Sequence, residues 1–112
     1  MVGAIRSAQG LIFVVATIQV AEGTREEFLR HFRELVPSVQ AEDGCIEYLP
    51  TIDVETGFSA QPPIRANAVT VMEKWKDLDA LKAHLVAPHM EEYRKNVKSI
   101  VVGTSLQVVE PV

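Results

Sequence analysis

The positions of hydrophobic residues along the chain predict a small domain that mixes strands and helices. Residues 11–20 are rich in β-branched side chains, which favours a strand. Thr24 stands three residues before Glu27, which is the spacing of a capping box at a helix start. Apolar residues then recur at helical spacing, at Phe28, Leu29, Phe32, Leu35, Val36 and Val39. We expect Pro37 to kink or end this helix early, and residues 1–10, which show no periodicity, to form a tail.

The middle of the chain predicts two strands joined by a long connection. Residues 45–54 have a strand pattern, and Pro50 within them favours an edge strand or a bulge. One face of this strand is expected to carry Ile46, Tyr48, Ile52 and Val54. Residues 55–68 form a hairpin loop, and loops of this length in compact domains are often functional or mobile. Residues 69–75 predict the next strand.

Two helical segments follow, with Pro88 between them. Asp77 is a candidate cap of the first segment, whose apolar stripe consists of Leu78, Leu81 and Leu85. Pro88 interrupts this pattern and suits the first position of a new helix. The apolar face of that helix is formed by Met90, Tyr93, Val97, Ile100 and Val101. We expect Gly103 to end the helix and residues 104–109 to form the last strand.

The predicted order, β-α-β-β-α-β, is that of a ferredoxin-like α+β fold with an antiparallel sheet. The first strand is apolar in both registers, with Phe13 and Val15 on one face and Ile12, Val14, Ala16 and Ile18 on the other. A sheet that is apolar on both faces needs a layer on each. The chain has no spare helix for the second layer, so we expect a homodimer formed by sheet packing. We assign residues 11–112 to one domain.

Composition narrows the function classes. The net charge is −4, and no basic stripe is interleaved with aromatic residues, so we expect no nucleic-acid partner. No run approaches about 18 apolar residues, so we expect no membrane span. The only cysteine, Cys45, excludes an intrachain disulfide and fits a reducing, cytoplasmic location. Arg6 and the apolar run after it mimic a signal peptide, but the fold needs this run as its first strand.

Common cofactor and metal motifs are missing from the sequence. There is no Gly-rich phosphate loop, no GxGxxG and no GxSxG. There is also no cysteine pair and no His-x-x-x-His spacing that would hold zinc. We therefore expect neither a cofactor nor a metal, and we interpret Cys45 as a small buried hydrophobic residue.

Two segments resemble the antibiotic biosynthesis monooxygenase family. Residues 71–90 contain Glu73-Lys74-Trp75 at a strand end, followed by Ala83-His84 and Pro88-His89. Residues 44–48 are similar to the Gly-Cys-x-x-Tyr opening of the family's second strand. The resemblance covers residues 11–109 and implies a ferredoxin-like dimer. Some members oxidise phenols, quinols or anthrones with O2 and no cofactor, others degrade haem, and others isomerise small sugar-derived ketones.

The resemblance argues against haem degradation. That branch of the family uses an asparagine on the first strand, a tryptophan on the second helix and a histidine further along. The matching positions here hold Ala16, His84 and Arg94. The connection over residues 55–68 is also longer than the short hairpin usual in the family.

Oxygenation without a cofactor needs an apolar pocket, a base that titrates near neutrality and donors for an oxyanion. His84 is the leading candidate for the base, since it lies roughly 90° from the centre of the leucine stripe. His89, at a helix start, would be kept neutral by the helix dipole. An unbroken helix would separate the two histidines by about 140°, so only the break at Pro88 lets them converge. Both also fit ordinary boundary or solvated positions.

Further candidates are substrate-binding residues, each with a plain structural alternative. Trp75 could stack on a flat ligand, and Tyr48 could donate its hydroxyl. Glu73, on the same strand face as Trp75, could orient a histidine, and Arg65 could meet an anionic substrate. We expect Met90 and Tyr93 above all in the core, and as pocket residues only in addition.

The sequence therefore favours a cofactor-independent monooxygenase that oxidises a quinol, phenol or anthrone with O2. A non-catalytic dimer that binds a small apolar ligand remains an alternative. So does a cofactor-free isomerase of a small carbonyl compound, since this fold hosts many activities.

Overall fold

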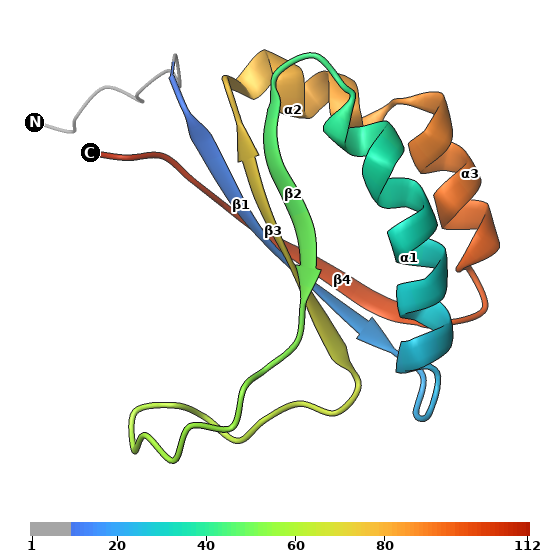
Figure 1. Cartoon of the computed structure of the whole chain (residues 1–112), viewed down its shortest axis with the longest axis vertical. Coiled ribbons are helices and arrows are strands. Elements are labelled where there is room, and N and C mark those ends of the chain that lie inside the picture. Colours follow the sequence, from blue (N-terminus) through green and yellow to red (C-terminus); the bar gives the residue numbers. More distant parts are fainter. Residues whose placement is uncertain (1–9) are drawn as a thin grey trace, which may run out of the picture.

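The computed structural model describes residues 10–112, and the expected tail over residues 1–10 lies outside them except for Gly10. The elements are β1 (Ile12–Val20), α1 (Arg25–Gln40), β2 (Cys45–Thr51), β3 (Ala68–Trp75), α2 (Leu78–Leu85), α3 (Pro88–Asn96) and β4 (Val101–Val109). Every strand pairing is antiparallel, and the strand order is β2-β3-β1-β4. This confirms the ferredoxin-like α+β fold (Figure 1).

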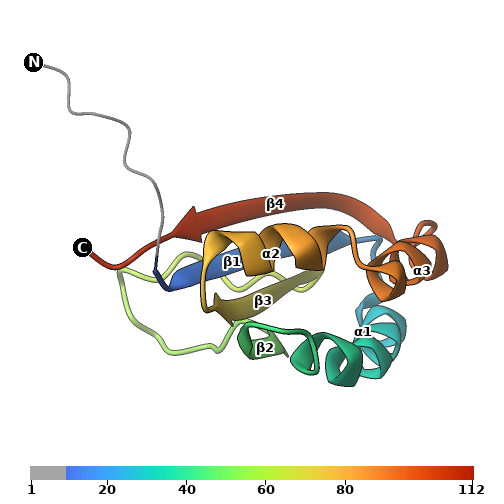
Figure 2. The same cartoon turned by 90° about the horizontal axis from the view of Figure 1, so that it is seen from above.

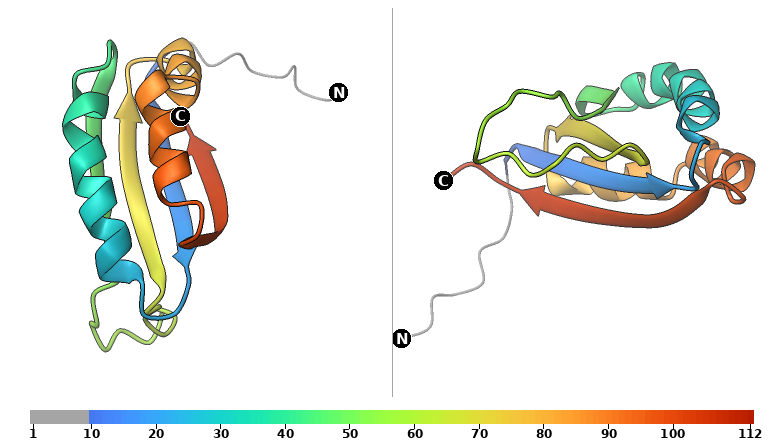
Figure 3. Two further views of the ribbon diagram at one scale, coloured as in Figure 1. Left: turned by 90° about the vertical axis from the view of Figure 1, so that its right-hand side faces the viewer. Right: turned by 90° about the horizontal axis from the view of Figure 1, so that it is seen from below.

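The sheet has two unequal faces. Helices α1 and α3 lie on one side of it, as the left view of Figure 3 shows. Along β1 the even-numbered residues Ile12 to Val20 are buried under this layer, while Phe13 and Val15 on the other face are only half-buried. Figure 2 shows the four strands from above, with no helix on the side opposite α1 and α3. As predicted, β1 carries apolar residues on both faces of the sheet.

Helix α1 departs from the sequence prediction at both ends. It runs on to Gln40, so the expectation that Pro37 ends it early is wrong. Buried Leu35 and Val39, one on each side of Pro37, hold the helix against the sheet. Thr24 makes no side-chain cap, because its hydroxyl donates to the carbonyl oxygen of Ala21 at 2.6 Å. The predicted capping box is therefore absent.

Strand β2 is an edge strand, as Pro50 predicts. It ends at Thr51, and a register shift occurs between Cys45 and Glu47. That shift breaks the expected alternation, so Tyr48 is buried while the other three residues predicted for its face are exposed: Ile46, Ile52 and Val54. The connection from β2 to β3 extends away from the sheet as a long arm (Figure 1).

The second helical region is broken at Pro88, as predicted, with α3 beginning at that residue. Asp77 caps α2 by accepting the Ala80 N–H at 2.8 Å. Helix α3 stops at Asn96, so Gly103 does not end it. Gly103 lies within β4, where it pairs with Gln19 of β1. No helix within residues 10–112 is long and apolar enough to cross a membrane.

Candidate active site

A pocket of about 450 Å³ lies between the helices and the inner face of the sheet. Its apolar wall is formed by Ala16, Ile18, Phe32, Val71, Met90 and Leu106. Its polar groups come from different elements: Tyr48 from β2, Glu73 from β3, His84 from α2 and Arg94 from α3. An apolar cavity with a few convergent polar side chains is the usual form of a small-molecule site.

His84 is the most deeply buried of these polar groups. Its side chain is 2% exposed, while Leu85 is 37% exposed, so the predicted leucine stripe is wrong at this turn. The ring packs against Trp75 with centroids 4.7 Å apart. Burial lowers the pKa of His84 against the raising effect of its contact with Glu42, and the positive charge of Arg94 lowers it further. This shift favours the neutral form of the ring.

Glu42 fixes the orientation of the His84 ring. Its Oε2 atom lies 3.0 Å from His84 Nδ1. A carboxylate can only accept, so Nδ1 carries the proton and Nε2 is left as an acceptor. Nε2 has no partner within the described part of the chain, and His84 lines the pocket. A neutral imidazole in this tautomer is suited to take a proton from a bound molecule.

The turn that carries Glu42 is pressed against α2. Gly44 has φ of +87°, and a Cβ atom built there would lie 2.6 Å from the Ala80 Cβ. The Gly44 carbonyl also accepts the Lys76 N–H at 2.9 Å. Only glycine gives both the left-handed backbone and this close approach. The contact places Glu42 beside His84.

His89 reaches the same carboxylate from α3. Its Nε2 atom lies 2.6 Å from Glu42 Oε2. The break at Pro88 turns α3 relative to α2, which brings together two rings that an unbroken helix would separate. His89 does not line the pocket but a second, smaller cavity at the surface. The two histidines therefore come together as expected, because both contact the same oxygen of Glu42.

Glu73 and Trp75 form a second buried pair. Both are buried, and the Trp75 indole N–H donates to Glu73 Oε1 at 2.9 Å. Burial raises the pKa of Glu73 to about 7, against the lowering effect of this hydrogen bond. Glu73 lines the pocket, whereas Trp75 lies behind His84 with its N–H already used. Glu73 thus positions no histidine, but it titrates near neutrality inside the pocket.

Aromatic residues form part of the pocket wall. Phe32 stacks on Tyr48 with centroids 5.5 Å apart and meets Tyr93 edge to face at 5.7 Å. Tyr48 also meets His84 edge to face at 5.3 Å. Burial raises the pKa of Tyr48 far above its usual range, so its hydroxyl stays protonated and can donate.

Positive charge lines part of the pocket. Arg94 and Lys98 both contribute to the lining, and the Arg94 Nη2 donates to the Leu85 carbonyl at 2.7 Å. This hydrogen bond ties Arg94 to the end of α2, close enough to His84 to affect its pKa. An anion formed in the pocket would meet a favourable field.

The structure gathers most of the sequence candidates but not all. His84, Tyr48, Glu73, Met90 and Tyr93 line the pocket. Arg65 does not, because it lies on the arm and pairs with Asp53 at 2.8 Å.

Sequence reasoning missed Glu42, which carries no motif of its own. It also missed the pocket roles of Phe32 and Leu106, whose spacing shows only that they are apolar.

Other sequence expectations can be placed on the structure. Cys45 is half-buried, and burial raises the pKa of its thiol to about 11, which suits an inert packing residue. No group of three or more histidine, cysteine or acidic side chains suited to a metal ion occurs among residues 10–112.

Comparisons with known proteins agree with this architecture. A family model described as antibiotic biosynthesis monooxygenase matches residues 11–96. The Escherichia coli K12 protein named "Probable quinol monooxygenase YgiN" is 32% identical over 103 residues, which cover 90% of this chain and 98% of YgiN. A solved structure from Caulobacter crescentus, assigned to the same family, has 26% identity and a TM-score of 0.79 over 95% of this chain and 93% of its own.

A more distant structure shows the same fold. PA3566 from Pseudomonas aeruginosa is 22% identical, with a TM-score of 0.75 over 98% of this chain and 99% of its own. The family match spans most of the chain, and the relative at 32% identity is covered almost completely. The chain belongs to the antibiotic biosynthesis monooxygenase family.

Proposed function

We propose that the protein is a cofactor-independent monooxygenase that oxidises an electron-rich aromatic substrate, a quinol, phenol or anthrone, with O2. The observation that carries this proposal is the contact of His84 Nδ1 with Glu42, which orients a buried ring that lines an apolar pocket. Membership of a family whose relatives carry monooxygenase names supports the reaction class. The pocket combines what such a reaction asks of a protein: an apolar wall, a base and hydrogen-bond donors.

The first step is proton removal. The aromatic substrate lies against Phe32, Met90 and Leu106, with a hydroxyl or acidic C–H directed toward His84. The Nε2 atom takes the proton, and the imidazolium is stabilised by the Glu42 carboxylate 3.0 Å from Nδ1. The substrate anion that remains is rich enough in electrons to react with O2.

Oxygen then enters by electron transfer and recombination. The anion passes one electron to O2, and the resulting substrate radical and superoxide combine into a peroxide at a ring carbon. The protonated His84 returns its proton to the peroxide, and loss of water together with the hydrogen of that carbon leaves a carbonyl, so one oxygen atom enters the product and the other leaves as water. The positive charges of Arg94 and Lys98 stabilise the anion and the superoxide, and Tyr48 donates its hydroxyl.

Glu73 is a second candidate for the base. It lines the same pocket, and its raised pKa of about 7 makes proton exchange easy near neutrality. A pair of groups like Glu73 and His84 would also suit a cofactor-free isomerase of a carbonyl compound. That reaction proceeds without oxygen, so strict dependence on O2 separates the two functions.

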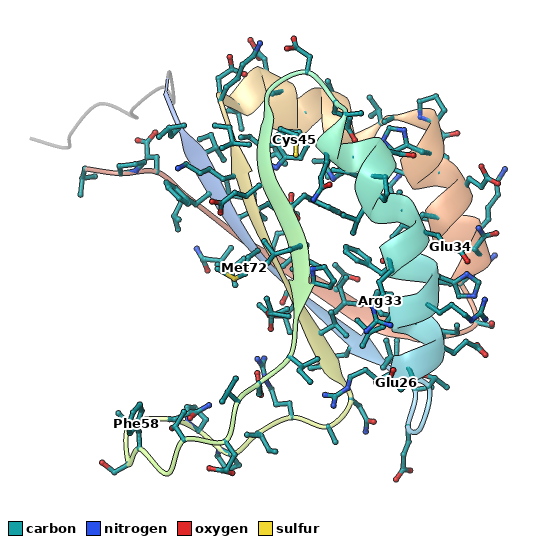
Figure 4. The ribbon with its side chains drawn as sticks, viewed as in Figure 1. Glu26, Arg33, Glu34, Cys45, Phe58 and Met72 are labelled. Carbon is teal, nitrogen blue, oxygen red and sulfur yellow. The ribbon has the colours of Figure 1, made fainter. Side chains whose placement is uncertain are left out.

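We also propose that the working unit is a homodimer formed through the outer sheet face. That face is defined by Phe13, Val15, Leu49, Met72 and Val109, which are half-buried or exposed. Figure 4 shows Met72 on the side of the sheet away from the helices. Apolar residues gathered on one face without a covering layer favour association with a second copy.

Oxygen uptake tests the proposed function. EDTA-treated protein is supplied with a panel of quinols, phenols and anthrones, and O2 consumption is compared with that of a His84→Ala/His89→Ala variant of equal circular dichroism. We expect uptake that the wild type supports and the variant loses. Equal uptake by both proteins would remove the histidines from the mechanism. If no panel substrate supported O2 uptake and a carbonyl compound were turned over without O2, the protein would be an isomerase and not an oxygenase.

A further inference from the structure

The arm that joins β2 to β3, residues 52–67, exposes large apolar side chains to solvent. Phe58 is 71% exposed and Val54 is 68% exposed, and Ile52 and Ile64 are close to half exposed. So many apolar side chains within one short segment exceed the scattered single ones that are normal on a monomer. We propose that the arm packs on a second copy of this chain. The inference rests on the homodimer proposed above, whose interface it extends beyond the sheet.

An ion pair braces the base of the arm. Asp53 accepts the backbone N–H of Arg65 at 2.8 Å and two N–H groups of its guanidinium at 2.9 and 2.8 Å. These hydrogen bonds lower the pKa of Asp53 to about 2, so the pair is present at neutral pH. Arg25, the first residue of α1, donates from its guanidinium to the Arg65 carbonyl at 3.1 Å. The two ends of the arm are therefore held together, and the arm leaves the sheet in a fixed direction.

A second set of hydrogen bonds shapes the tip of the arm. The side-chain amide of Gln61 donates to the Val54 carbonyl at 2.8 Å, and its oxygen accepts the Thr56 hydroxyl. The backbone N–H of Phe58 donates to the Thr56 Oγ1 at 3.1 Å. The tip thus satisfies these polar groups within itself and leaves the Phe58 ring in solvent, at the far end of the arm (Figure 4).

The arm projects toward the side of the sheet opposite the helices. Figure 2 and the right view of Figure 3 both show it on the side away from α1 and α3. Figure 4 shows Phe58 and Met72 on this same side. A copy that covers the outer sheet face therefore lies on the side to which the arm extends. In a two-fold dimer each arm meets the other copy, so the contact forms twice.

The charge of the arm favours a protein partner over a membrane. Its charged residues are Asp53, Glu55 and Arg65, and the single cation is already paired with Asp53. Segments that dock on anionic lipid carry an excess of lysine and arginine, which the arm lacks. A second copy offers apolar surface on the correct side and asks for no positive charge.

Sedimentation equilibrium of Phe58→Asp tests the contact. The side chain is exposed in the single chain, so the fold should tolerate the change. We expect the Kd of the dimer to rise roughly 10- to 100-fold, because two buried rings are lost and two charges are buried per dimer. Val86→Asp, at a position that is 72% exposed after α2, should keep the Kd of the wild type. An unchanged Kd in Phe58→Asp would overturn the arm contact and leave the dimer through the sheet intact.

Fluorescence locates the arm directly. In Phe58→Trp, after subtraction of the wild-type spectrum, we expect blue-shifted emission in the dimer and a red shift on dilution below the Kd. Adding Met72→Glu to this variant should give the red-shifted emission at every concentration. Solvent-exposed emission from a dimer, or a blue shift that appears only with phosphatidylcholine vesicles, would overturn the arm contact.

The outcomes also separate this inference from the proposals on which it rests. A wild type that is monomeric at every concentration would overturn both the arm contact and the proposed dimer. Failure of the oxygen-uptake panel would remove the proposed reaction, while sedimentation and fluorescence would still decide where the arm packs.

Discussion

The Nδ1 atom of His84 lies 3.0 Å from Oε2 of Glu42, although the two residues are 42 positions apart in the chain. The turn after α1 and the helix α2 meet at this contact. It fixes which ring nitrogen of His84 carries the proton, and therefore which one faces the pocket as an acceptor. The chemistry of the site depends on this single orientation.

Replacing His84 tests its role as the base. We expect His84→Asn to lower kcat for oxygen uptake by about 100-fold or more, since positioned proton transfer typically contributes this much. His31→Asn, in the neighbouring surface cavity, should leave kcat unchanged. Steady-state uptake over a range of substrate concentrations separates kcat from KM. A loss confined to KM would mean that His84 only binds substrate.

The raised pKa of Glu73 makes stability depend on pH. Burial raises the pKa of this carboxyl from 4.5 to about 7, so the folded protein binds its proton more tightly than the unfolded chain does. This stabilisation is fully present below pH 4.5 and is lost as the pH rises through about 7. The total change amounts to roughly 3 kcal/mol in the free energy of unfolding.

The Glu73→Gln variant should lack this contribution while still accepting the Trp75 N–H. Urea unfolding of both proteins between pH 5 and pH 8 gives the difference, in which other titrating groups such as His84 cancel. We expect the variant to gain stability relative to the wild type as the pH rises. A constant difference over this range would show that Glu73 ionises at its ordinary pKa.

Gly44 should be far less tolerant of substitution than Gly23. Both have positive φ, but a Cβ at Gly44 would lie 2.6 Å from the Ala80 Cβ, whereas at Gly23 it would meet nothing within 4 Å. We expect Gly23→Ala to cost roughly 1–2 kcal/mol of unfolding free energy, from the backbone alone. Gly44→Ala should cost roughly 2–5 kcal/mol, since steric strain adds to this. Similar midpoints of urea unfolding for the two variants would contradict the close packing of the turn on α2.

Arg94 is expected to act through its charge. Arg94→Gln should lower kcat about 10- to 100-fold, because the substrate anion and superoxide lose a stabilising cation. The same variant should raise the pKa of His84, which Arg94 lowers. Arg30→Gln, an exposed position on α1, serves as the control. NMR titration of His84 gives the second readout, and an unchanged pKa would place the guanidinium away from the ring.

Local patterns were enough to predict the fold from the sequence. The order of strands and helices, the Asp77 cap and the break at Pro88 each depend on neighbouring residues, and each is confirmed. The errors occur where distant packing overrides a local signal. Burial on both sides of Pro37 carries α1 through the proline, and the pairing of Gly103 with Gln19 keeps that glycine in a strand.

The candidate site was predictable only in part, for the same reason. His84 and Glu73 stand out by residue type and family pattern. Glu42 becomes important only because the Gly44 turn approaches α2, and one sequence without the fold carries no sign of that contact. Trp75 is buried behind His84, so its position fits the core alternative given for it rather than stacking on a ligand.

The outer sheet face gives a prediction about assembly. Met72 is 40% exposed at the centre of this face, paired with Val15 on β1 and Leu49 on β2. If two copies pack there, a charge at this position is taken out of water without a partner, which costs several kcal/mol. We expect the wild type to sediment as a dimer at micromolar concentration and Met72→Glu to sediment as a monomer. Val86→Glu, at an exposed position after α2, should stay dimeric. A monomeric wild type, or a dimeric Met72→Glu, would show that the outer face is not the interface.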